Sequence, residues 1–368
     1  MNVPLDLKYR PKKFDDMFQP HIVKALKNSI KYQRIPNTLI FTGWTGIGKT
    51  SLARLYAMAL NCQNLSDDQE PCGSCESCKR IAQSTSMDVE EINVAEKTGI
   101  DDVRRMIDEK YHLMPVLGKY RVFLLDEAHC LSSQGQNALL KPLEEAPDHV
   151  VFILCTTEVD KIIDTISCRA QEWSFDRVSE EVLTENLEKI CQQENFEYSA
   201  EALKMIAMVS DGSPRKSIKL LEQICSDEIN VDNVETILKI TPRALSLDIL
   251  LGASSGNIEY LINIVDILNS QGKNLILVLK QLSLDVSNLI RFIAGVKLDV
   301  DPVSISKMES ILKNIPQKSL KKRIRKASKV IISLFEAINY RNVAKDLVLT
   351  NGLIDLSLAL RDDEFLED

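Results

Sequence analysis

Apolar residues in the first half of the chain alternate between two spacings. Short, nearly continuous apolar runs predict buried strands at 38–42, 89–94, 120–125 and 150–155. Apolar residues at helical spacing predict helices between these strands, at 49–60, 100–110 and 132–145. Strands that alternate with helices in this way predict a parallel α/β sheet with helices on both faces.

The second half of the chain shows helical spacing only. Beyond about residue 178 we expect a group of helices at 180–193, 200–210 and 214–225. A longer helical block follows at about 242–360, with Leu275, Leu279, Leu282 and Val286 on one face and short polar breaks at 252–256 and 299–302. We therefore predict three domains: an α/β domain at 1–177, a small helical domain at 178–241 and an all-α domain at 242–368 with an acidic tail at 362–368.

Composition narrows the class of protein. The chain has 368 residues, 45% of them hydrophobic and 27% charged, which fits a globular protein of two or three domains. No apolar run approaches the ~20 residues of a membrane span, and residues 1–11 are basic and polar, unlike a secretory signal. We therefore expect a cytoplasmic protein without membrane contact. Its nine cysteines are then core residues, metal ligands or redox sites.

The charge balance limits how the chain could contact nucleic acid. A formal net charge of −8 excludes a protein that coats DNA over its whole surface. Contact with DNA would need a local basic patch, such as one built from several subunits. The basic run at 321–326 favours a solvated helix face over a phosphate-binding stripe.

A glycine-rich loop follows the first predicted strand. Its sequence, from Gly43 to Thr50, fits the P-loop pattern G-x-x-x-x-G-K-[ST], and a predicted helix begins at its end. Backbone N–H groups of such a loop, together with the helix N-terminus, surround phosphates. Lys49 is expected to bridge the β and γ phosphates of ATP, and Thr50 to hold Mg²⁺. The predicted ATP-binding residues of this loop are Gly43, Trp44, Thr45, Gly46, Ile47, Gly48, Lys49, Thr50 and Ser51.

Two carboxylates end the third predicted strand. If this strand lies beside the P-loop strand, Asp126 and Glu127 come close to the γ-phosphate. Asp126 would then support Mg²⁺, and Glu127 would polarise the attacking water as general base. An acidic pair at a strand end is more often simply solvated, but the P-loop upstream favours the catalytic interpretation.

Four of the cysteines form a compact sequence cluster. Cys62, Cys72, Cys75 and Cys78 have the spacing C-x9-C-x2-C-x2-C, which predicts a closed, structural zinc site. A disulfide pair is disfavoured by the compartment. An iron–sulfur cluster would need a further cysteine followed by proline, which the segment lacks. We expect Cys130, Cys155, Cys191 and Cys225, which lie in apolar stretches, in the core.

Together these motifs resemble the gamma/tau subunit family of the bacterial DNA polymerase III clamp loader, which are AAA+ ATPases. The resemblance covers residues 5–225 and follows family order from Lys8-Tyr9-Arg10-Pro11 through the P-loop, the cysteine module and Asp126-Glu127-Ala128-His129. It implies that Tyr9, Arg10 and Pro11 lie against the nucleotide base. It also implies that Thr157 belongs to the sensor 1 segment, and that Arg215 is the sensor 2 arginine at the start of a lid helix.

The chain departs from the family pattern at three places. The Ser-Arg-Cys motif becomes Cys168-Arg169-Ala170, and Arg169 is the residue that the resemblance implies as an arginine finger acting on a neighbour's ATP. Pro142 should kink or end the predicted helix at 132–145. Pro20 replaces a polar helix start. Without the resemblance, Arg169 and Arg215 would be read as solvated surface arginines.

The resemblance also implies a function and partners. It implies an AAA+ domain with an inserted zinc module, a helical lid at 178–241 and an all-α collar at 242–368. Such a subunit hydrolyses ATP with Mg²⁺ inside a hetero-oligomeric, pentameric ring, and loads a sliding clamp onto primer–template DNA for the DNA-directed DNA polymerase. Because the chain ends soon after the collar, we expect the short, gamma-like form.

Two other functions are compatible with parts of the pattern. A non-catalytic scaffold subunit of the same assembly would share the zinc module, but such relatives have degraded P-loops. A nucleic-acid helicase is suggested by Asp-Glu-Ala-His at 126–129. Helicases of that class need a second motor lobe, whereas the second half of this chain shows only a helical pattern.

Overall fold

The computed structural model describes residues 3–96, 107, 109–225, 228–239, 243–298, 302–339 and 344–361. The chain separates into two compact units, Met1–Ser226 and Asp227–Asp368. Most of the predicted helix at 100–110 and the whole acidic tail at 362–368 lie outside the described residues. None of the helices in the described part has the length and apolar character to span a bilayer.

A five-stranded parallel sheet organises the first unit, in the order β2-β3-β4-β1-β5. Its strands are β1 (Thr38–Thr42), β2 (Val89–Asn93), β3 (Arg121–Asp126), β4 (Val150–Thr156) and β5 (Gln171–Ser174). The predicted parallel α/β sheet is therefore confirmed. The expectation that β3 lies beside β1 is wrong, because β4 pairs with both strands and separates them.

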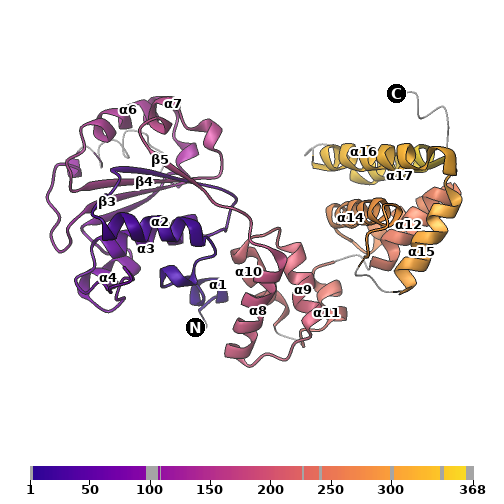
Figure 1. The fold of residues 1–368 in the computed structure, drawn as a ribbon, viewed down its shortest axis with the longest axis horizontal. Coiled ribbons are helices and arrows are strands. Elements are labelled where there is room, and N and C mark those ends of the chain that lie inside the picture. The colour runs from indigo at the N-terminus through magenta and orange to yellow at the C-terminus, as the bar shows by residue number, and fades with distance from the viewer. Residues whose placement is uncertain are drawn as a thin grey trace. The chain divides into compact units, whose positions relative to one another are not determined.

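Side chains that alternate along the strands build two cores, one on each face of the sheet. Leu39, Phe41 and Leu124 face the core formed with α2 (Pro20–Lys31) and α3 (Lys49–Leu60). Ile40, Leu125 and Leu154 face the opposite core, formed with α6 (Ser133–Glu144) and α7 (Asp164–Ser167). Figure 1 shows α2 and α3 on one side of the sheet and α6 and α7 on the other. Burial on both faces explains why the strands are apolar runs without polar alternation.

The first unit also contains several short helices, and a group of three helices follows β5. The short elements are α1 (Leu5–Lys8), α4 (Glu76–Ala82), η1 (Phe14–Asp16), η2 (Ala128–Cys130) and η3 (Val159–Lys161). The group consists of α8 (Glu180–Glu194), α9 (Ala200–Val209) and α10 (Pro214–Ile224). Each of these three begins at a serine, Ser179, Ser199 or Ser213, whose hydroxyl accepts a hydrogen bond from the N3 backbone N–H.

The two prolines at which the sequence departs from the family pattern lie in helices. Pro20 is the first residue of α2, where its missing N–H is not needed and its fixed φ favours the helix. This helix was not predicted, although Ile22, Val23 and Leu26 mark its buried face. Pro142 lies inside α6, which continues past it and ends at Glu144.

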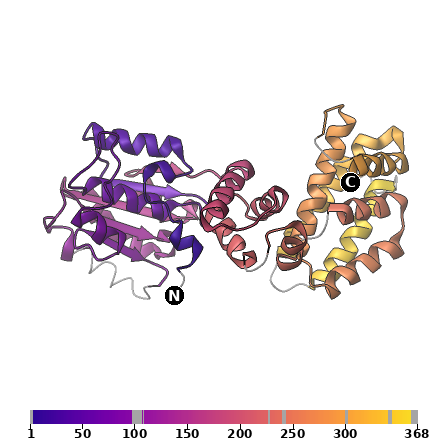
Figure 2. The same cartoon turned by 90° about the horizontal axis from the view of Figure 1, so that it is seen from below.

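The described part of the second unit consists of helices (Figures 1 and 2). They are α11 (Val231–Ile237), α12 (Arg243–Ser255), α13 (Ile258–Ser270), α14 (Leu275–Ile293), α15 (Pro302–Asn314), η4 (Gln317–Ser319), α16 (Leu320–Asn339) and α17 (Lys345–Arg361). One core gathers residues from α12 to α17, including Leu279, Leu282 and Val286 of the predicted apolar face.

The predicted polar break at 252–256 is too early. Gly252 lies inside α12, and a Cβ at this position would meet the Tyr260 ring at 2.7 Å, so the glycine permits close packing of α12 on α13. The chain turns only at Gly256, which has a φ of +74°. The division into three domains at 177 and 241 stays a prediction.

Candidate functional site

The P-loop residues 43–50 connect the end of β1 to the start of α3, as predicted. Lys49 is 7% exposed, and its ammonium donates hydrogen bonds to the carbonyl oxygens of Gly43 (2.6 Å) and Trp44 (3.0 Å). Burial lowers the pKa of Lys49 from its ordinary value. A bound phosphate would favour the charged form again, so this side chain is suited to an anion held inside the loop.

Two glycines in the loop are required by their surroundings. Gly46 has a φ of +76°, and a Cβ there would meet the Ser213 hydroxyl at 2.6 Å. Gly48 has a φ of +106°, and a Cβ there would meet the Met17 side chain at 2.9 Å. Other residues would be strained at both positions. The loop is therefore enclosed by the start of α10 on one side and by the N-terminal segment on the other.

Asp126 reaches the P-loop although its strand is not adjacent to β1. The Thr50 hydroxyl donates a hydrogen bond of 2.9 Å to one Asp126 carboxylate oxygen. Backbone N–H of Glu127 donates to the other oxygen at 3.2 Å. The hydroxyl and carboxylate predicted to hold Mg²⁺ are thus in direct contact.

Glu127 is positioned by backbone conformation and by a histidine. Its φ of +53° lies in the left-handed region, which is uncommon for a residue with a side chain and occurs often at functional sites. The imidazole Nδ1 of His129 lies 3.5 Å from the Glu127 carboxylate, and its Nε2 lies 3.5 Å from that of Glu158. His129 closes the Asp-Glu-Ala-His motif, but the motif alone predicted no role for it.

The residues predicted for sensor 1 follow β4, between the P-loop strand and the acidic strand. Thr157 is half-buried directly after the strand end. Its neighbour Thr156 is fully buried, and the Thr156 hydroxyl lies 3.3 Å from the His129 Nδ1. Because β3 and β4 are parallel neighbours, Thr157 lies at the same carboxyl end of the sheet as Asp126 and Glu127.

The N-terminal residues predicted to face the nucleotide base divide between two elements. Arg10 Nε donates to the Ser51 hydroxyl at 3.1 Å, which places Arg10 at the start of α3. Burial, then the neighbouring Arg54 charge, lowers the pKa of Arg10. The Tyr9 hydroxyl instead donates to Glu194 at the end of α8. Pro11, the next residue along the chain, is half-buried.

The start of α10 packs directly on the P-loop. The Arg215 backbone N–H donates to the Gly46 carbonyl at 3.2 Å, and the Ser213 hydroxyl donates to the Thr45 carbonyl at 3.1 Å. The Arg215 guanidinium pairs with Asp6 at 3.0 Å and is more than half exposed. The predicted sensor 2 residue therefore lies beside the loop, and Asp6 is a partner that sequence reasoning missed.

Trp44, one of the variable residues of the P-loop, has a partner in the structure. The residue is 62% exposed, and the Arg177 guanidinium lies 3.9 Å from the centroid of its ring. This is a cation–π contact. It joins the P-loop to the segment between β5 and α8.

Arg169 lies on the surface, two residues after the end of α7. It donates to the Thr165 carbonyl at 2.7 Å and pairs with Glu144 of α6 at 2.6 Å. Its side chain is 42% exposed. This position fits either the predicted finger or a surface ion pair.

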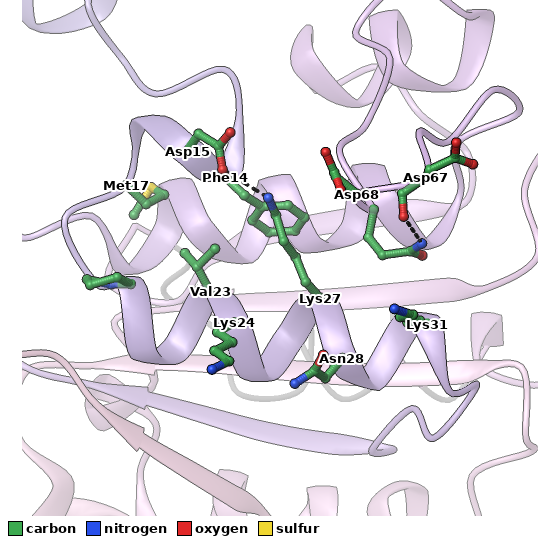
Figure 3. A pocket seen from close by; sticks show the side chains of 12 residues that line it. Phe14, Asp15, Met17, Val23, Lys24, Lys27, Asn28, Lys31, Asp67 and Asp68 are labelled. Carbon is green, nitrogen blue, oxygen red and sulfur yellow. Dashed lines mark hydrogen bonds and ion pairs between the residues drawn. The ribbon is translucent and has the colours of Figure 1, made fainter.

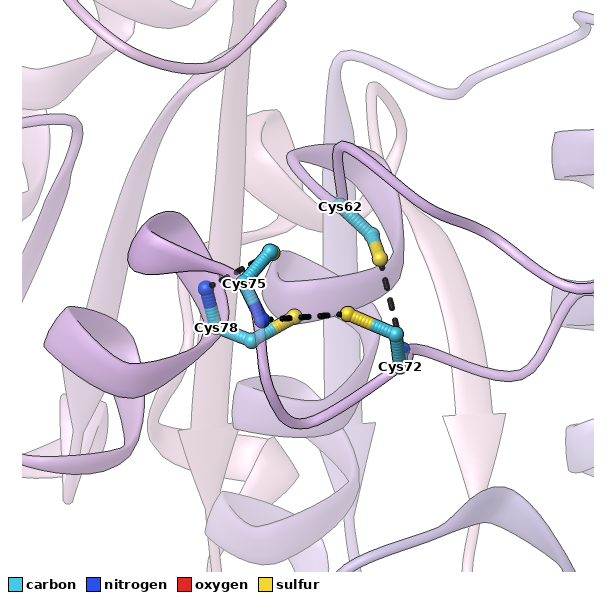
Figure 4. A group of neighbouring side chains, drawn as sticks. All are labelled: Cys62, Cys72, Cys75 and Cys78. Atoms are coloured by element: carbon cyan, nitrogen blue, oxygen red, sulfur yellow. Dashed lines mark hydrogen bonds between the residues drawn. The ribbon is translucent and has the colours of Figure 1, made fainter.

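The four predicted zinc ligands come together (Figure 4). The sulfur atoms of Cys62, Cys72, Cys75 and Cys78 all lie within 4.8 Å of one another. Three backbone N–H groups donate to these sulfurs at 3.3–3.4 Å. Although burial acts to raise it, hydrogen bonds from the Cys75 and Ser74 backbone lower the pKa of Cys72 to about 6. The donor set and spacing fit a soft, tetrahedral metal ion.

The other cysteines are only partly in the core. Cys155 and Cys191 are buried, as predicted, and Cys225 is half-buried. The prediction for Cys130 is wrong, because this residue is exposed. Cys130 is the last residue of η2, which follows β3 and lies outside the sheet. The apolar residues of β3 are therefore buried in the core, whereas Cys130 is not.

The fold and the loop define a P-loop protein, in which a parallel α/β sheet carries the loop between β1 and α3 and an acidic strand end reaches its threonine. The DNA polymerase III gamma subunit of Buchnera aphidicola subsp. Baizongia pistaciae is 33% identical to the chain over 345 residues, which cover 91% of this chain and 86% of that protein. The chain belongs to the family of DNA polymerase III gamma/tau subunits.

Other comparisons agree with this family. The gamma/tau subunit of Mycoplasma genitalium is 37% identical over 290 residues, covering 77% of this chain. The chain spans 48% of that relative and 37% of the Haemophilus influenzae tau/gamma subunit, so it spans half or less of their length. The family model of the DNA polymerase III delta subunit matches residues 18–179.

The RuvB Holliday junction branch migration motor of Thermotoga maritima matches with a TM-score of 0.47 and 20% identity, over 72% of this chain and 86% of that one. Membership of the gamma/tau family is carried by the sequence relatives.

Proposed function

We propose that this chain is an ATP-binding and ATP-hydrolysing AAA+ subunit of the DNA polymerase III clamp loader. In this proposal it assembles with other subunits into a pentameric hetero-oligomer, in the cytoplasm. ATP binding lets the assembly open a sliding clamp and hold primer–template DNA, and hydrolysis releases both. The observation that carries the proposal is the 2.9 Å contact of Thr50 with Asp126 beside the buried Lys49.

The geometry supports a division of roles at this site. Lys49 and the loop N–H groups would hold the β and γ phosphates, and Thr50 and Asp126 would hold Mg²⁺, which neutralises charge on the transferred phosphoryl group. Glu127, next to Asp126 and beside His129, would orient the attacking water. Tyr9, Arg10 and Pro11 would contact the base, while Thr157 and Arg215 would sense the γ-phosphate.

The two alternative functions have less support. A scaffold subunit would not need both an intact lysine in the loop and a threonine–carboxylate pair beside it. A helicase of the Asp-Glu-Ala-His class needs a second motor lobe. Within the described ranges, all five strands belong to the first unit, and the second unit is helical. Strand separation assays with and without clamp would distinguish a helicase from a clamp loader.

Replacement of Glu127 by glutamine is expected to leave ATP binding intact and to slow hydrolysis about 100-fold or more, because only the water-activating carboxylate is lost. The measurement is steady-state ATPase of the assembled complex, with purified clamp and primed DNA added in turn. We expect stimulation of the wild type by both additions and no stimulation of Glu127→Gln. Glu158→Gln is the matched control, since Glu158 contacts His129 from the exposed side. Wild-type turnover by Glu127→Gln would refute the assignment.

We also propose that the four-cysteine cluster holds one structural zinc ion, as a closed site for which all four ligands come from the chain. The zinc would fix the segment between α3 and α4, where Cys75 is also the N-cap of α4. No ligand position is left for a substrate, so the zinc would have no direct part in hydrolysis.

Serine in place of Cys75 is therefore expected to remove the zinc, which is about one ion per chain in the wild type, and to lower the thermal stability of the first unit. Metal analysis and a thermal unfolding curve measure both effects. The exposed Cys168 provides the control, because Cys168→Ser should keep the metal. Full zinc content in Cys75→Ser would contradict the proposed site and would leave the P-loop proposal unaffected.

A further inference from the structure

The segment between Cys62 and Cys72 contacts the N-terminal elements through one carboxylate. Glu70, two residues before Cys72, pairs with Lys27 of α2 at 2.6 Å. Its other oxygen accepts a hydrogen bond of 2.9 Å from the Phe14 backbone N–H, at the start of η1. The side chains of Glu70 and Lys27 are only 14% and 20% exposed. This pair is therefore better protected from solvent than an ordinary surface ion pair.

Lys27 is one of the residues that line a cavity beside α2 (Figure 3). This cavity, of about 530 Å³, lies between α2 and the loop that carries Asp67, Asp68 and Gln69. Within the described residues, Lys27–Glu70 is the only ion pair that links α2 with this loop. Lys27 also pairs with Asp15 at 2.9 Å, and its ammonium lies 5.8 Å from the Phe14 ring centroid. The Lys27–Glu70 pair thus joins α2 to the loop on the other side of this cavity.

The segment that Glu70 holds leads directly to the P-loop. Phe14 is fully buried, and Met17, three residues later, packs against Gly48 so closely that a Cβ there would lie 2.9 Å from the methionine methyl group. Before Phe14, the Arg10 side chain reaches Ser51 at the start of α3. Both ends of the segment 10–17 therefore touch the nucleotide-binding loop or the helix that follows it.

We propose that Glu70 is a positioning residue for nucleotide binding. It ties the cysteine module to segment 10–17 and so fixes the position of this segment over the P-loop. The module then does more than stabilise its own loop, because its correct folding is required for Glu70 to reach Phe14 and Lys27. This inference depends on the proposed ATP binding, and it assigns no part in the chemical step to Glu70.

The test is the dependence of steady-state ATPase on ATP concentration for the wild type, Glu70→Ala and Glu70→Gln. We expect Glu70→Ala to raise KM for ATP about threefold to tenfold, a range typical of coupling between packed elements. Its kcat should change less than twofold, because Asp126 and Glu127 are untouched. Glu70→Gln keeps an acceptor for the Phe14 N–H. Its KM for ATP should therefore lie between the values for the wild type and for Glu70→Ala. Zinc content and the thermal unfolding midpoint, measured on the same samples, should match the wild type.

Two further variants sharpen this test. Lys27→Ala removes the ion pair but leaves the Phe14 N–H hydrogen bond, so it should raise KM less than Glu70→Ala does. The double variant should be no worse than Glu70→Ala alone, since Glu70→Ala already removes that ion pair. Asp15→Asn is the matched control, because Asp15 pairs with Lys27 from a position that is 76% exposed and should leave KM unchanged. A wild-type KM for Glu70→Ala, or a lower kcat at unchanged KM, would overturn the inference. Absence of ATP turnover in the wild type would instead overturn the proposed function.

Discussion

Replacement of Lys49 by alanine is expected to weaken ATP binding about 100-fold or more, the cost of removing one partner from a buried charge pair. Lys49 is almost completely buried, and its ammonium already lies among the loop carbonyls that would surround the phosphates. No other described lysine lies inside the loop. Equilibrium binding of a fluorescent ATP analogue would measure the loss.

The fold should survive this change, because the apolar contacts of α3 with the sheet do not involve Lys49. Far-ultraviolet circular dichroism and the unfolding midpoint check this. Lys204→Ala removes the same charge from an exposed position on α9 and should bind ATP like the wild type. Wild-type affinity of Lys49→Ala would rule out the P-loop as the nucleotide site.

Replacement of Arg169 by alanine is expected to reduce ATP hydrolysis in the assembled complex by about 10³-fold or more, if Arg169 acts as a finger on the neighbouring subunit. A planar guanidinium can pair with phosphate oxygens as charge develops on them. ATP binding by the variant's own P-loop should hardly change, and the isolated chain should be slow with or without Arg169. Single-turnover hydrolysis with clamp and primed DNA is the measurement.

The ion pair between Arg169 and Glu144 provides a matched control. Glu144→Gln removes that pair and leaves the arginine in place, so it should keep hydrolysis near the wild-type rate. Complexes that mix Arg169→Ala with Lys49→Ala subunits should regain part of the activity, because some interfaces then combine an intact finger with an intact P-loop. Normal stimulated hydrolysis by Arg169→Ala alone would show that Arg169 serves only as a surface partner of Glu144.

Features that depend on neighbouring residues in the sequence were predictable. The glycine loop fixes its own strand-to-helix geometry, and the cysteine spacing brings four sulfurs together within one short segment. The core strands were predictable because burial on both faces makes them continuous apolar runs. The edge strand β5 was missed, since Gln171 and Glu172 are exposed and the strand has no apolar run.

Features that depend on contacts across the fold were not predictable. Nothing in the local pattern of β3 or β4 states which of them pairs with β1, so the strand order had to come from the structure. The partners of Arg215 and Trp44, which are Asp6 and Arg177, are far away along the chain. Glu70 looks like one more charge in a polar loop, and only its contacts with Phe14 and Lys27 distinguish it.

The position of β4 between β1 and β3 also sets a condition for folding during synthesis. Both neighbours of β1 come later in the chain, β4 beginning at Val150 and β5 at Gln171. A growing chain that has released only the P-loop and the cysteine module therefore exposes β1 without a partner. Such long-range parallel pairing is slow and leaves an apolar strand open to aggregation. The strand that carries the P-loop therefore gains its neighbours only after β4 and β5 have left the ribosome.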